Sequence, residues 1–501
     1  MLDLAFRPDP GAAPPVYQQL ASHLTELIEA ERLVAGERVP PTRDLAASLG
    51  LSRNTVSRAY ESLAAAGLLG AHVGRGTFVR PAGRRPGPVA APRGATRPAF
   101  AWQALLSQRA RALRAPAGLR LVRPEGVRFD FRPGRVDADA LPIAELQKAW
   151  QRALGGALRG RANEIDPLGH EPLRAAIARS LGTRGIAVRA DALLVTAGAQ
   201  QALDLVARAL LDPGDVVAIE QPGYFGAALA FQGCGATLIG VGVDGEGLRV
   251  DELARVLRSR RAKLVYTTPA AQLPTGVTLS DARRVALLEL ADREQVPILE
   301  DDYDCELRLA GPAAPALKNQ DRADQVVYVG TFSKALFPGL RLGYVVAAPA
   351  LLAQLALGRL AASFQPSLVD QLALAELLGG DAVERHVRRV RKRCAERARA
   401  MADALTASMP EGTRFRTPAG GTAIWVELPP GVDPAALAAD AAARGIAYAP
   451  GEGFRLAAGA PPALLLSFAA APPEAIREGV AELAALVERQ LGAAGRARSR
   501  S

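Results

Sequence analysis

Lysine is scarce in this chain. Lysine and arginine together number 61 in 501 residues, yet only five are lysines. These are Lys148, Lys263, Lys318, Lys334 and Lys392. Arginine stays protonated and cannot form a Schiff base, whereas a lysine that loses its proton can. The composition therefore excludes most of the positive charge from covalent amine chemistry and makes each lysine a candidate worth weighing.

Cysteine, aromatic residues and long apolar runs are also in short supply. Cys234, Cys305 and Cys394 are odd in number and lack metal-ligand spacing, which predicts no metal site and fits a reducing cytoplasm. No apolar run approaches about 18 residues, so we expect no membrane span. Asp3 and Asp9 interrupt the N-terminus, so we expect no signal peptide. With 5% aromatic residues, the cores must rest on Ala, Leu and Val.

Acidic residues are absent from one basic stretch. The net charge is +10, and residues 62–124 contain eleven arginines but no Asp or Glu. Those arginines are Arg75, Arg80, Arg84, Arg85, Arg93, Arg97, Arg109, Arg111, Arg114, Arg120 and Arg123. Residues 80–98 are also rich in Pro, Gly and Ala, which predicts an extended linker, followed by a short helix over 100–114. The arginines are either solvated linker charge or attract phosphate.

The first eighty residues predict three helices and a hairpin. Apolar spacing indicates a helix over 16–31, Thr42 is placed to cap one over 43–49, and Ser52 one over 53–66. The last helix should bury Val56, Tyr60, Leu63 and Ala64. A glycine-rich hairpin over 71–79 follows. Two helices around a tight glycine turn are typical of a DNA-binding helix-turn-helix, although an ordinary three-helix bundle is the alternative.

From about residue 129 the chain alternates helical segments with short apolar runs. The runs predicted to be strands are 193–197, 216–220, 263–267, 296–301 and 326–330. Strands that alternate with helices favour an α/β fold with a mainly parallel sheet, in which ligands bind at the carboxyl ends of the strands.

Polar residues gather at those strand ends. Gly198 to Gln201 opens a helix and suits a phosphate, because amide donors and the helix dipole converge there. Tyr224, Asp301, Tyr303, Lys334 and Arg341 follow other strands. Each alone fits a bland role as a cap, core residue or ion-pair partner. Together they match an aldehyde cofactor with a pyridine ring and a phosphate, for which lysine forms the imine.

Two stretches resemble known families. The first includes Pro41-Thr-Arg-Asp-Leu-Ala, Leu51-Ser-Arg-Asn-Thr-Val-Ser-Arg-Ala-Tyr and Gly74-Arg-Gly-Thr-Phe-Val, and it resembles the winged helix-turn-helix of GntR-type regulators. The resemblance implies double-stranded operator DNA as a partner. The DNA-facing residues it implies are Arg43, Arg53, Asn54, Thr55, Ser57, Arg58 and Arg75.

The second stretch, residues 120–490, resembles fold-type-I pyridoxal-phosphate aminotransferases, with large and small subdomains. It carries Glu220-Gln-Pro-Gly-Tyr, Glu300-Asp-Asp-Tyr-Asp and Gly330-Thr-Phe-Ser-Lys. This resemblance implies pyridoxal 5'-phosphate as an imine on Lys334, with Asp301 at the pyridine nitrogen, Tyr303 at the ring hydroxyl and Tyr224 stacked on the ring. The residues implied around the phosphate are Gly198, Ala199, Gln200, Thr331, Ser333 and Arg341.

Several positions depart from the aminotransferase pattern. Leu465 stands where those enzymes place the arginine that grips a substrate carboxylate, and Arg455 is the nearest substitute in sequence. Ala271 and Leu273 stand where similar proteins have histidine and asparagine, and Ile165 ends a segment that commonly carries a tyrosine reaching the partner's phosphate. These changes predict a pocket that keeps its cofactor grip better than its substrate grip.

The whole chain resembles the MocR subfamily of GntR regulators. We expect a winged helix-turn-helix over 1–80, a basic linker over 81–119, an aminotransferase-like domain over 120–490 and a basic tail over 491–501. The resemblance implies a cytoplasmic homodimeric regulator, with each DNA-binding head reaching over the partner, that senses pyridoxal phosphate or an amine or amino-acid effector. The alternatives are an active aminotransferase with an attached DNA-binding domain, and a DNA-binding protein with a cofactor-free domain. Residual transaminase activity stays open.

Overall fold

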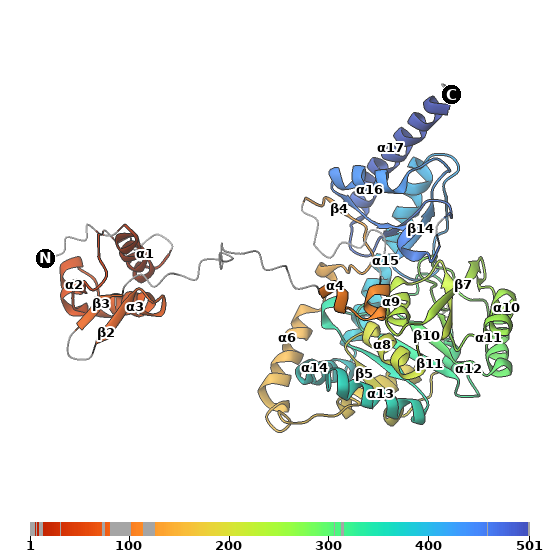
Figure 1. The fold of residues 1–501 in the computed structure, drawn as a ribbon, viewed down its shortest axis with the longest axis horizontal. Coiled ribbons are helices and arrows are strands. Elements are labelled where there is room, and N and C mark those ends of the chain that lie inside the picture. Colours follow the sequence, from red (N-terminus) through yellow and green to blue (C-terminus); the bar gives the residue numbers. More distant parts are fainter. Residues whose placement is uncertain are drawn as a thin grey trace. The chain divides into compact units, whose positions relative to one another are not determined.

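The computed structural model describes residues 6, 8–9, 14–30, 32–72, 76–80, 102–113, 126–304, 306–311, 315–457 and 459–498. Two compact units divide the chain, Met1–Ala101 and Trp102–Ser501 (Figure 1). Most of the predicted linker lies outside the described residues. In place of one helix over 100–114, the larger unit begins with two short helices, α4 (Trp102–Leu105) and α5 (Gln108–Ala112). The second of these contacts α9 (Phe225–Gly233).

The smaller unit packs three helices against an antiparallel sheet. The helices are α1 (Val16–Glu29), α2 (Thr42–Leu49) and α3 (Arg53–Ala65), and the strands in sheet order are β1 (Arg38–Val39), β3 (Gly76–Val79) and β2 (Leu69–His72). Leu20, Leu45 and Val56 come from the three helices in turn and are buried in a common core. The winged helix-turn-helix expected from the sequence is therefore present, and β1 adds a third strand to the wing.

Two local predictions in this unit are wrong. Pro41, not Thr42, occupies the N-cap of α2, and Thr42 begins the helix without capping it. Ala64 is exposed, and Ala59 is buried in its place. A step of three residues from Val56 brings Ala59 onto the buried face of α3, because residues three and four apart share a helix face.

The larger unit contains an eight-stranded sheet. Its order is β5 (Leu193–Thr196), β12 (Gly343–Val346), β11 (Val326–Thr331), β10 (Ile298–Asp302), β9 (Leu264–Thr267), β6 (Val216–Gln221), β7 (Thr237–Asp244) and β8 (Gly247–Leu248). The adjacent pairs from β7 to β11 are parallel, as predicted, whereas β12 runs antiparallel to both β11 and β5. The carboxyl ends of β5 and β11 therefore meet, since Thr196 and Thr331 both pair with Gly343.

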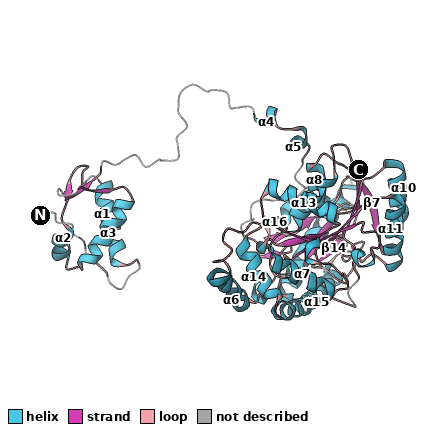
Figure 2. Cartoon of the chain, turned by 90° about the horizontal axis from the view of Figure 1, so that it is seen from below, coloured by secondary structure: helices cyan, strands magenta, loops and turns pink. Residues whose placement is uncertain are grey.

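Helices cover both faces of this sheet (Figure 2). One face packs against α8 (Ala199–Leu210), α9 and α13 (Pro349–Ala362). The other face packs against α7 (Glu171–Gly182), α10 (Val250–Arg260), α11 (Asp281–Glu294), α12 (Leu317–Gln320) and α14 (Leu368–Leu378). Helix α6 (Ile143–Arg152) packs on α14 and continues into a π-helical turn, Ala153–Ala157. The strands are buried on both sides, which explains their continuous apolar sequence.

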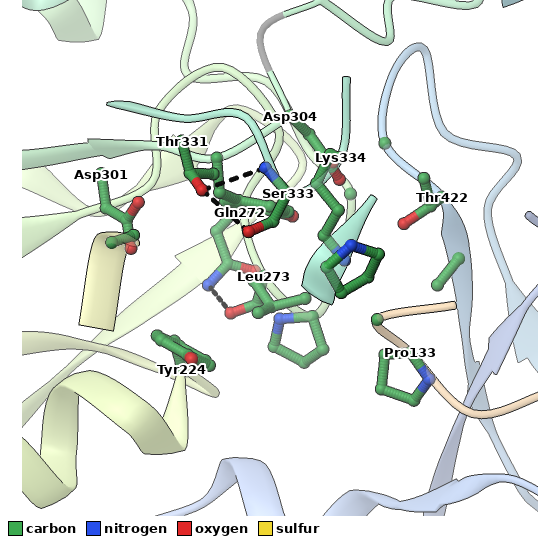
Figure 3. A pocket seen from close by; sticks show the side chains of 18 of the residues that line it. Pro133, Tyr224, Gln272, Leu273, Asp301, Asp304, Thr331, Ser333, Lys334 and Thr422 are labelled. Atoms are coloured by element: carbon green, nitrogen blue, oxygen red, sulfur yellow. Dashed lines mark hydrogen bonds between the residues drawn. The ribbon is translucent and has the colours of Figure 1, made fainter. Parts of the chain in front are cut away.

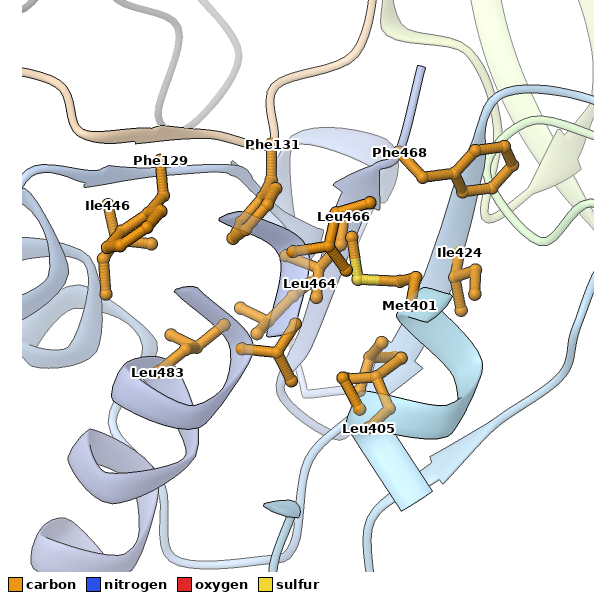
Figure 4. Close-up of a cluster of buried hydrophobic side chains, with 14 of the residues drawn as sticks. Phe129, Phe131, Met401, Leu405, Ile424, Ile446, Leu464, Leu466, Phe468 and Leu483 are labelled. Carbon is orange, nitrogen blue, oxygen red and sulfur yellow. The ribbon is translucent and has the colours of Figure 1, made fainter. Parts of the chain in front are cut away.

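A smaller subdomain follows within the same unit. Its sheet has the order β13 (Arg414–Phe415), β14 (Ala423–Glu427), β17 (Ala463–Ser467) and β16 (Ala449–Pro450), beside the pair β15 (Ile446–Ala447) and β4 (Phe129–Asp130). Its helices are α15 (Ala382–Ser408), α16 (Pro434–Ala443) and α17 (Pro473–Arg498). Their apolar side chains close one core around Met401 and Leu466 (Figure 4). In the described part of the chain, no helix combines the length and apolar character of a membrane span.

Candidate cofactor site and DNA-binding surface

A cavity of about 290 Å³ lies at the carboxyl ends of the central strands, facing the smaller subdomain (Figure 3). Of the ten residues predicted to hold a cofactor, all but Gly198 line it: Ala199, Gln200, Tyr224, Asp301, Tyr303, Thr331, Ser333, Lys334 and Arg341. Residues 420–423 and Phe454 close the cavity from the smaller subdomain. Side chains from distant parts of the chain therefore converge on one site.

Only one carboxylate oxygen of Asp301 has a hydrogen-bond partner among the described residues. It is 3% exposed at the end of β10, and its Oδ2 accepts a hydrogen bond of 2.9 Å from the Tyr266 hydroxyl. Its Oδ1 is buried and has no hydrogen-bond partner among the described residues. Burial raises the pKa of Asp301 to about 7, and the neighbouring carboxylates of Asp302 and Asp304 add to the rise. A protonated ring nitrogen at Oδ1 would offset that cost.

Lys334 and Arg341 both come from the connection between β11 and β12. Because these strands are antiparallel, the chain leaves Thr331 and returns at Gly343, which brings both cations to the same edge of the sheet. Thr331 Oγ1 donates to Ser333 Oγ at 3.1 Å and accepts from the Ser333 amide at 3.2 Å. These bonds fix the turn that carries Lys334 into the cavity.

The start of α8 forms a cradle beside Arg341. Gly198 has a φ of 83°, and a Cβ there would lie 2.9 Å from the Arg341 guanidinium. Arg341 Nη2 donates to the Ala197 carbonyl at 3.1 Å. Gly343 runs beneath, where a Cβ would lie 3.1 Å from the Ala199 amide nitrogen. Amides in the first helical turn have no intrahelical acceptor, so this cradle presents donors and a guanidinium to an anion.

Two tyrosines flank the cavity. The Tyr224 hydroxyl donates to Gln200 Oε1 at 3.2 Å, and Gln200 Nε2 donates to the Gly226 carbonyl at 2.7 Å, so Gln200 positions the ring of Tyr224. Burial raises the pKa of Tyr224 to about 12. The Tyr303 hydroxyl donates to the Ala271 carbonyl at 2.9 Å, which leaves its oxygen able to accept. Both phenols therefore stay neutral at physiological pH.

Sequence reasoning missed three residues of this site. Tyr266 orients Asp301 from within the sheet. Gln272 lines the cavity and donates to the buried carboxylate of Glu220 at 3.2 Å. Asp304 lines the cavity beside Lys334 and is 5% exposed. Asp304 belongs to the acidic run at the end of β10, which the sequence shows. Only the fold shows which carboxylates of that run line the cavity.

Of the four positions that depart from the aminotransferase pattern, only Leu273 lines the cavity. Leu465 is fully buried in a cluster with Trp425 and Phe454, against which Leu273 packs. Arg455 does not line the cavity: its guanidinium lies 5.5 Å from the centroid of the Trp425 ring and donates to the Pro461 carbonyl. The proposed substitute for the missing arginine is thus engaged elsewhere in this structure.

In the smaller unit, α3 presents polar side chains at its start. Ser52 caps the helix by accepting from the Thr55 amide at 3.1 Å, as predicted. Arg53 and Asn54 are exposed, and Thr55 and Ser57 are half-buried. These side chains come from the first two turns of the second helix of the motif, the part that enters the major groove in helix-turn-helix proteins.

The remaining residues of the predicted DNA-facing set differ in their surroundings. Arg43 is exposed on α2. Arg58 is also exposed, but its guanidinium lies 4.1 Å from the centroid of the Tyr17 ring, a cation–π contact that ties α3 to α1. Arg75, predicted at the tip of the wing, lies outside the described residues.

The cavity fits pyridoxal phosphate. It combines one lysine, a half-satisfied buried carboxylate and a helix start with an adjacent guanidinium, the donor set that an aldehyde, a pyridine nitrogen and a phosphate require. A winged helix-turn-helix joined to such a domain defines a class of protein, the DNA-binding regulator built on an aminotransferase-like fold.

Comparisons with known proteins agree with this class. Residues 16–79 match the model of bacterial regulatory proteins of the gntR family, and residues 135–483 match aminotransferase class I and II. The HTH-type transcriptional regulator TauR of Rhodobacter capsulatus is 36% identical over 491 residues, 95% of this chain and 97% of TauR. The probable rhizopine catabolism regulatory protein MocR of Rhizobium meliloti is 36% identical over 398 residues, 78% of this chain and 77% of that protein.

Among solved structures, the α-aminoadipate aminotransferase LysN of Thermus thermophilus superposes with a TM-score of 0.73 at 32% identity. That comparison covers 78% of this chain and 100% of LysN, which was solved with N-(5'-phosphopyridoxyl)-L-leucine. The chain belongs to the MocR subfamily of GntR-type regulators, a winged helix-turn-helix fused to a fold-type-I aminotransferase-like domain. It is thus a DNA-binding transcriptional regulator, and its fold implies pyridoxal phosphate as the cofactor.

Proposed function

We propose that this regulator holds pyridoxal phosphate covalently on Lys334 and that the state of this site controls operator binding. In this proposal Asp301 contacts the pyridine nitrogen, Tyr303 the ring hydroxyl and Tyr224 the ring face. The phosphate group is held by Gly198, Ala199, Gln200, Thr331, Ser333 and Arg341. When bound, pyridoxal phosphate would supply an electrophilic carbon that can form an imine with a ligand amine in place of the lysine.

The observation that carries the proposal is the half-satisfied Asp301. The Tyr266 hydroxyl donates a hydrogen bond to Oδ2, and the buried Oδ1 has no hydrogen-bond partner among the described residues. Leaving a buried acceptor unsatisfied costs on the order of 1–3 kcal/mol. A cationic ring nitrogen at Oδ1 removes this cost and holds the carboxyl ionised, so cofactor binding stabilises the carboxylate of Asp301.

The lack of an arginine for a substrate carboxylate favours a sensor over an efficient aminotransferase. A bidentate arginine on a carboxylate contributes charge-assisted hydrogen bonds, roughly 1.5–3 kcal/mol each. Leu465 offers none, and Arg455 is held by Trp425 and Pro461. An α-amino acid would therefore bind weakly, and any transamination is residual.

We further propose a homodimer, with each DNA-binding head reaching over the partner's large domain. Ile165 and Phe364 are 60% and 58% exposed, and Gln365 bonds the backbone on either side of Ile165. Ser363 in turn accepts from Gln201 in the first turn of α8. The exposed apolar pair thus lies beside the anion cradle, and burying two large apolar side chains against a second copy is favourable.

The experiment for the covalent anchor is an absorption spectrum of the full chain mixed with pyridoxal phosphate. We expect a band of the lysine-bound cofactor that borohydride reduces irreversibly, with the label on the peptide that contains Lys334. Lys334→Ala should lose both signals, and Lys318→Ala, a matched change outside the cavity, should keep them. A labelled peptide from elsewhere in the chain would overturn the assignment.

A further inference from the structure

Asp304 is a buried carboxylate of the cavity lining. It lines the cavity, is 5% exposed, and neither of its oxygens has a hydrogen-bond partner among the described residues. Burial raises the pKa of Asp304 to about 6, and the nearby Lys334 and Thr422 side chains oppose that rise. The other carboxylates of the same acidic run are better satisfied, since Asp302 accepts from Arg184 and from Tyr328 at 2.6 Å.

Small residues lie beside the buried carboxylate of Asp304. A Cβ built on Gly421 would lie 3.4 Å from Asp304 Oδ2 and 3.7 Å from the Ala271 methyl, so a glycine and an alanine are neighbours of the carboxylate. In Figure 3, Asp304 and Thr422 lie on the same side of the cavity as Lys334, away from Tyr224. Asp304 therefore belongs to the part of the cavity lining that carries Lys334.

The charged residues that line the cavity indicate which kind of ligand group Asp304 would bind. Among the described lining residues the cations are Lys334 and Arg341, and the carboxylates are Asp301 and Asp304. The cofactor proposed above uses Lys334, Arg341 and Asp301, which leaves one negative charge. A ligand carboxylate would meet that charge or the apolar wall of Phe225 and Leu273, whereas an ammonium would form a charge-assisted hydrogen bond.

We propose that Asp304 binds the second, cationic group of a linear aliphatic diamine, which is the class of effector this regulator senses. The proposal rests on the proposed function, because the first amine of the ligand is the one that reaches the anchored cofactor. Phe225, Leu273 and Phe454 contact the methylene chain between the two amines. A diamine thus offers one amine to the cofactor, one cation to Asp304 and a methylene chain to the apolar lining residues.

Calorimetric titration of the full chain loaded with pyridoxal phosphate tests this proposal. The probes are linear diamines of three to six carbons, the monoamines of the same length, and the amino acids in which a terminal carboxylate replaces the second amine. We expect the best diamine to bind at least about tenfold more tightly than its monoamine, and the amino acid more weakly than either. Equal or tighter binding of the monoamine or the amino acid overturns the proposal.

Substitution of Asp304 tests whether its carboxylate causes the preference for diamines. Asp304→Asn should reduce the ratio of monoamine to diamine dissociation constants to near one, and Asp304→Glu, which keeps the charge, should retain a preference. Asp302→Asn makes the same change at the neighbouring buried carboxylate, which does not line the cavity, and should leave the ratio unchanged. If Asp304→Asn keeps the wild-type ratio, Asp304 is not the site that binds the second amine. If Asp304→Asn does not fold, the ratio measured for the wild type still shows whether the protein prefers diamines.

The two proposals fail in different ways. The absorption band of the lysine-bound cofactor is recorded before any amine is added, so its absence overturns the anchor at Lys334. Calorimetry reports amine binding with or without that band. A normal band with no preference for diamines overturns the role of Asp304 and leaves the cofactor assignment standing.

Discussion

Buried carboxylates dominate the site at the scale of single residues. Asp301 and Asp304 lie in a region with little water, so burial raises their pKa values to about 7 and about 6 from an ordinary value of 3.8. Between pH 4 and 7 the folded protein then holds more protons than the unfolded chain, and its stability falls as the pH rises. The two carboxylates proposed to bind ligands therefore destabilise the ligand-free protein when they are ionised.

Asp301→Asn should therefore stabilise the ligand-free protein. The amide cannot ionise, so at pH 8 we expect a gain of a few kcal/mol in the free energy of unfolding, following roughly 1.4 kcal/mol per pKa unit. The gain should shrink as the pH falls through 7 and vanish below about pH 3, where the wild-type carboxyl is protonated in both the folded and the unfolded state. Urea unfolding across this range checks it, and a gain that does not depend on pH contradicts the electrostatic explanation.

At the scale of elements, the antiparallel strand β12 builds the anion cradle. It carries Gly343 under the start of α8, where an added Cβ would lie 2.8 Å from the Gly330 carbonyl oxygen and 3.0 Å from the Gly198 carbonyl carbon. Both neighbours are backbone atoms, so neither can move aside without a large cost in free energy. The close approach of β11, β12 and α8 therefore requires glycine.

Gly343→Ala should weaken both the fold and cofactor binding. We expect a loss of about 1–3 kcal/mol from overpacking and a large fall in pyridoxal phosphate affinity, measured by urea unfolding and by titration of the absorption band. Gly358→Ala is the matched control: in α13 the new methyl would lie 3.5 Å from Leu205 Cδ2, an ordinary contact. That variant should be neutral or more stable by about 0.5–1 kcal/mol, and equal behaviour of the two variants would count against the cradle.

The cap of α3 gives an independent test in the DNA-binding unit. Ser52→Ala removes the acceptor for the Thr55 amide and should cost about 1 kcal/mol. Amide hydrogen exchange in α3 should then be about fivefold faster in the full chain. Ser48→Ala, in which the lost hydroxyl only donates to the Leu45 carbonyl within α2, should leave exchange in α3 unchanged. Unchanged exchange in Ser52→Ala would contradict the role of the cap.

The sequence predicted the elements whose signals are local. Each predicted strand is a short apolar run ending in polar residues, and five of these runs are strands of the central sheet. The antiparallel strand β12 was missed because its pairing with β5 and β11 depends on residues far away in sequence. Asp304 was missed for a related reason, since its burial depends on Gly421 and Thr422 of the smaller subdomain.

At the scale of the whole molecule, control of DNA binding requires that ligands bind two arrangements of the chain with different affinity. The fold provides one site for the cofactor and one surface for DNA on two separate units. In the proposed dimer, the interface with a second copy of the chain would couple them.

Replacing the exposed apolar pair should shift the protein towards monomers. Ile165→Asn with Phe364→Asn places polar side chains on this surface, and asparagine tolerates the left-handed backbone of Phe364, where φ is 59°. Sedimentation equilibrium should show a dimer for the wild type and mainly monomer for the double variant. Val285→Asn changes a 49% exposed apolar residue on α11 and should remain dimeric; a dimeric double variant would exclude this face as the interface.

The most direct test of coupling is the affinity of the full chain for DNA flanking its own gene, footprinted with and without pyridoxal phosphate. We expect the cofactor to change the dissociation constant by about 5- to 150-fold, the usual range of allosteric coupling. The change should disappear in Lys334→Ala and the affinity itself should fall in Arg53→Ala. A wild-type affinity that is the same with and without pyridoxal phosphate would contradict the account.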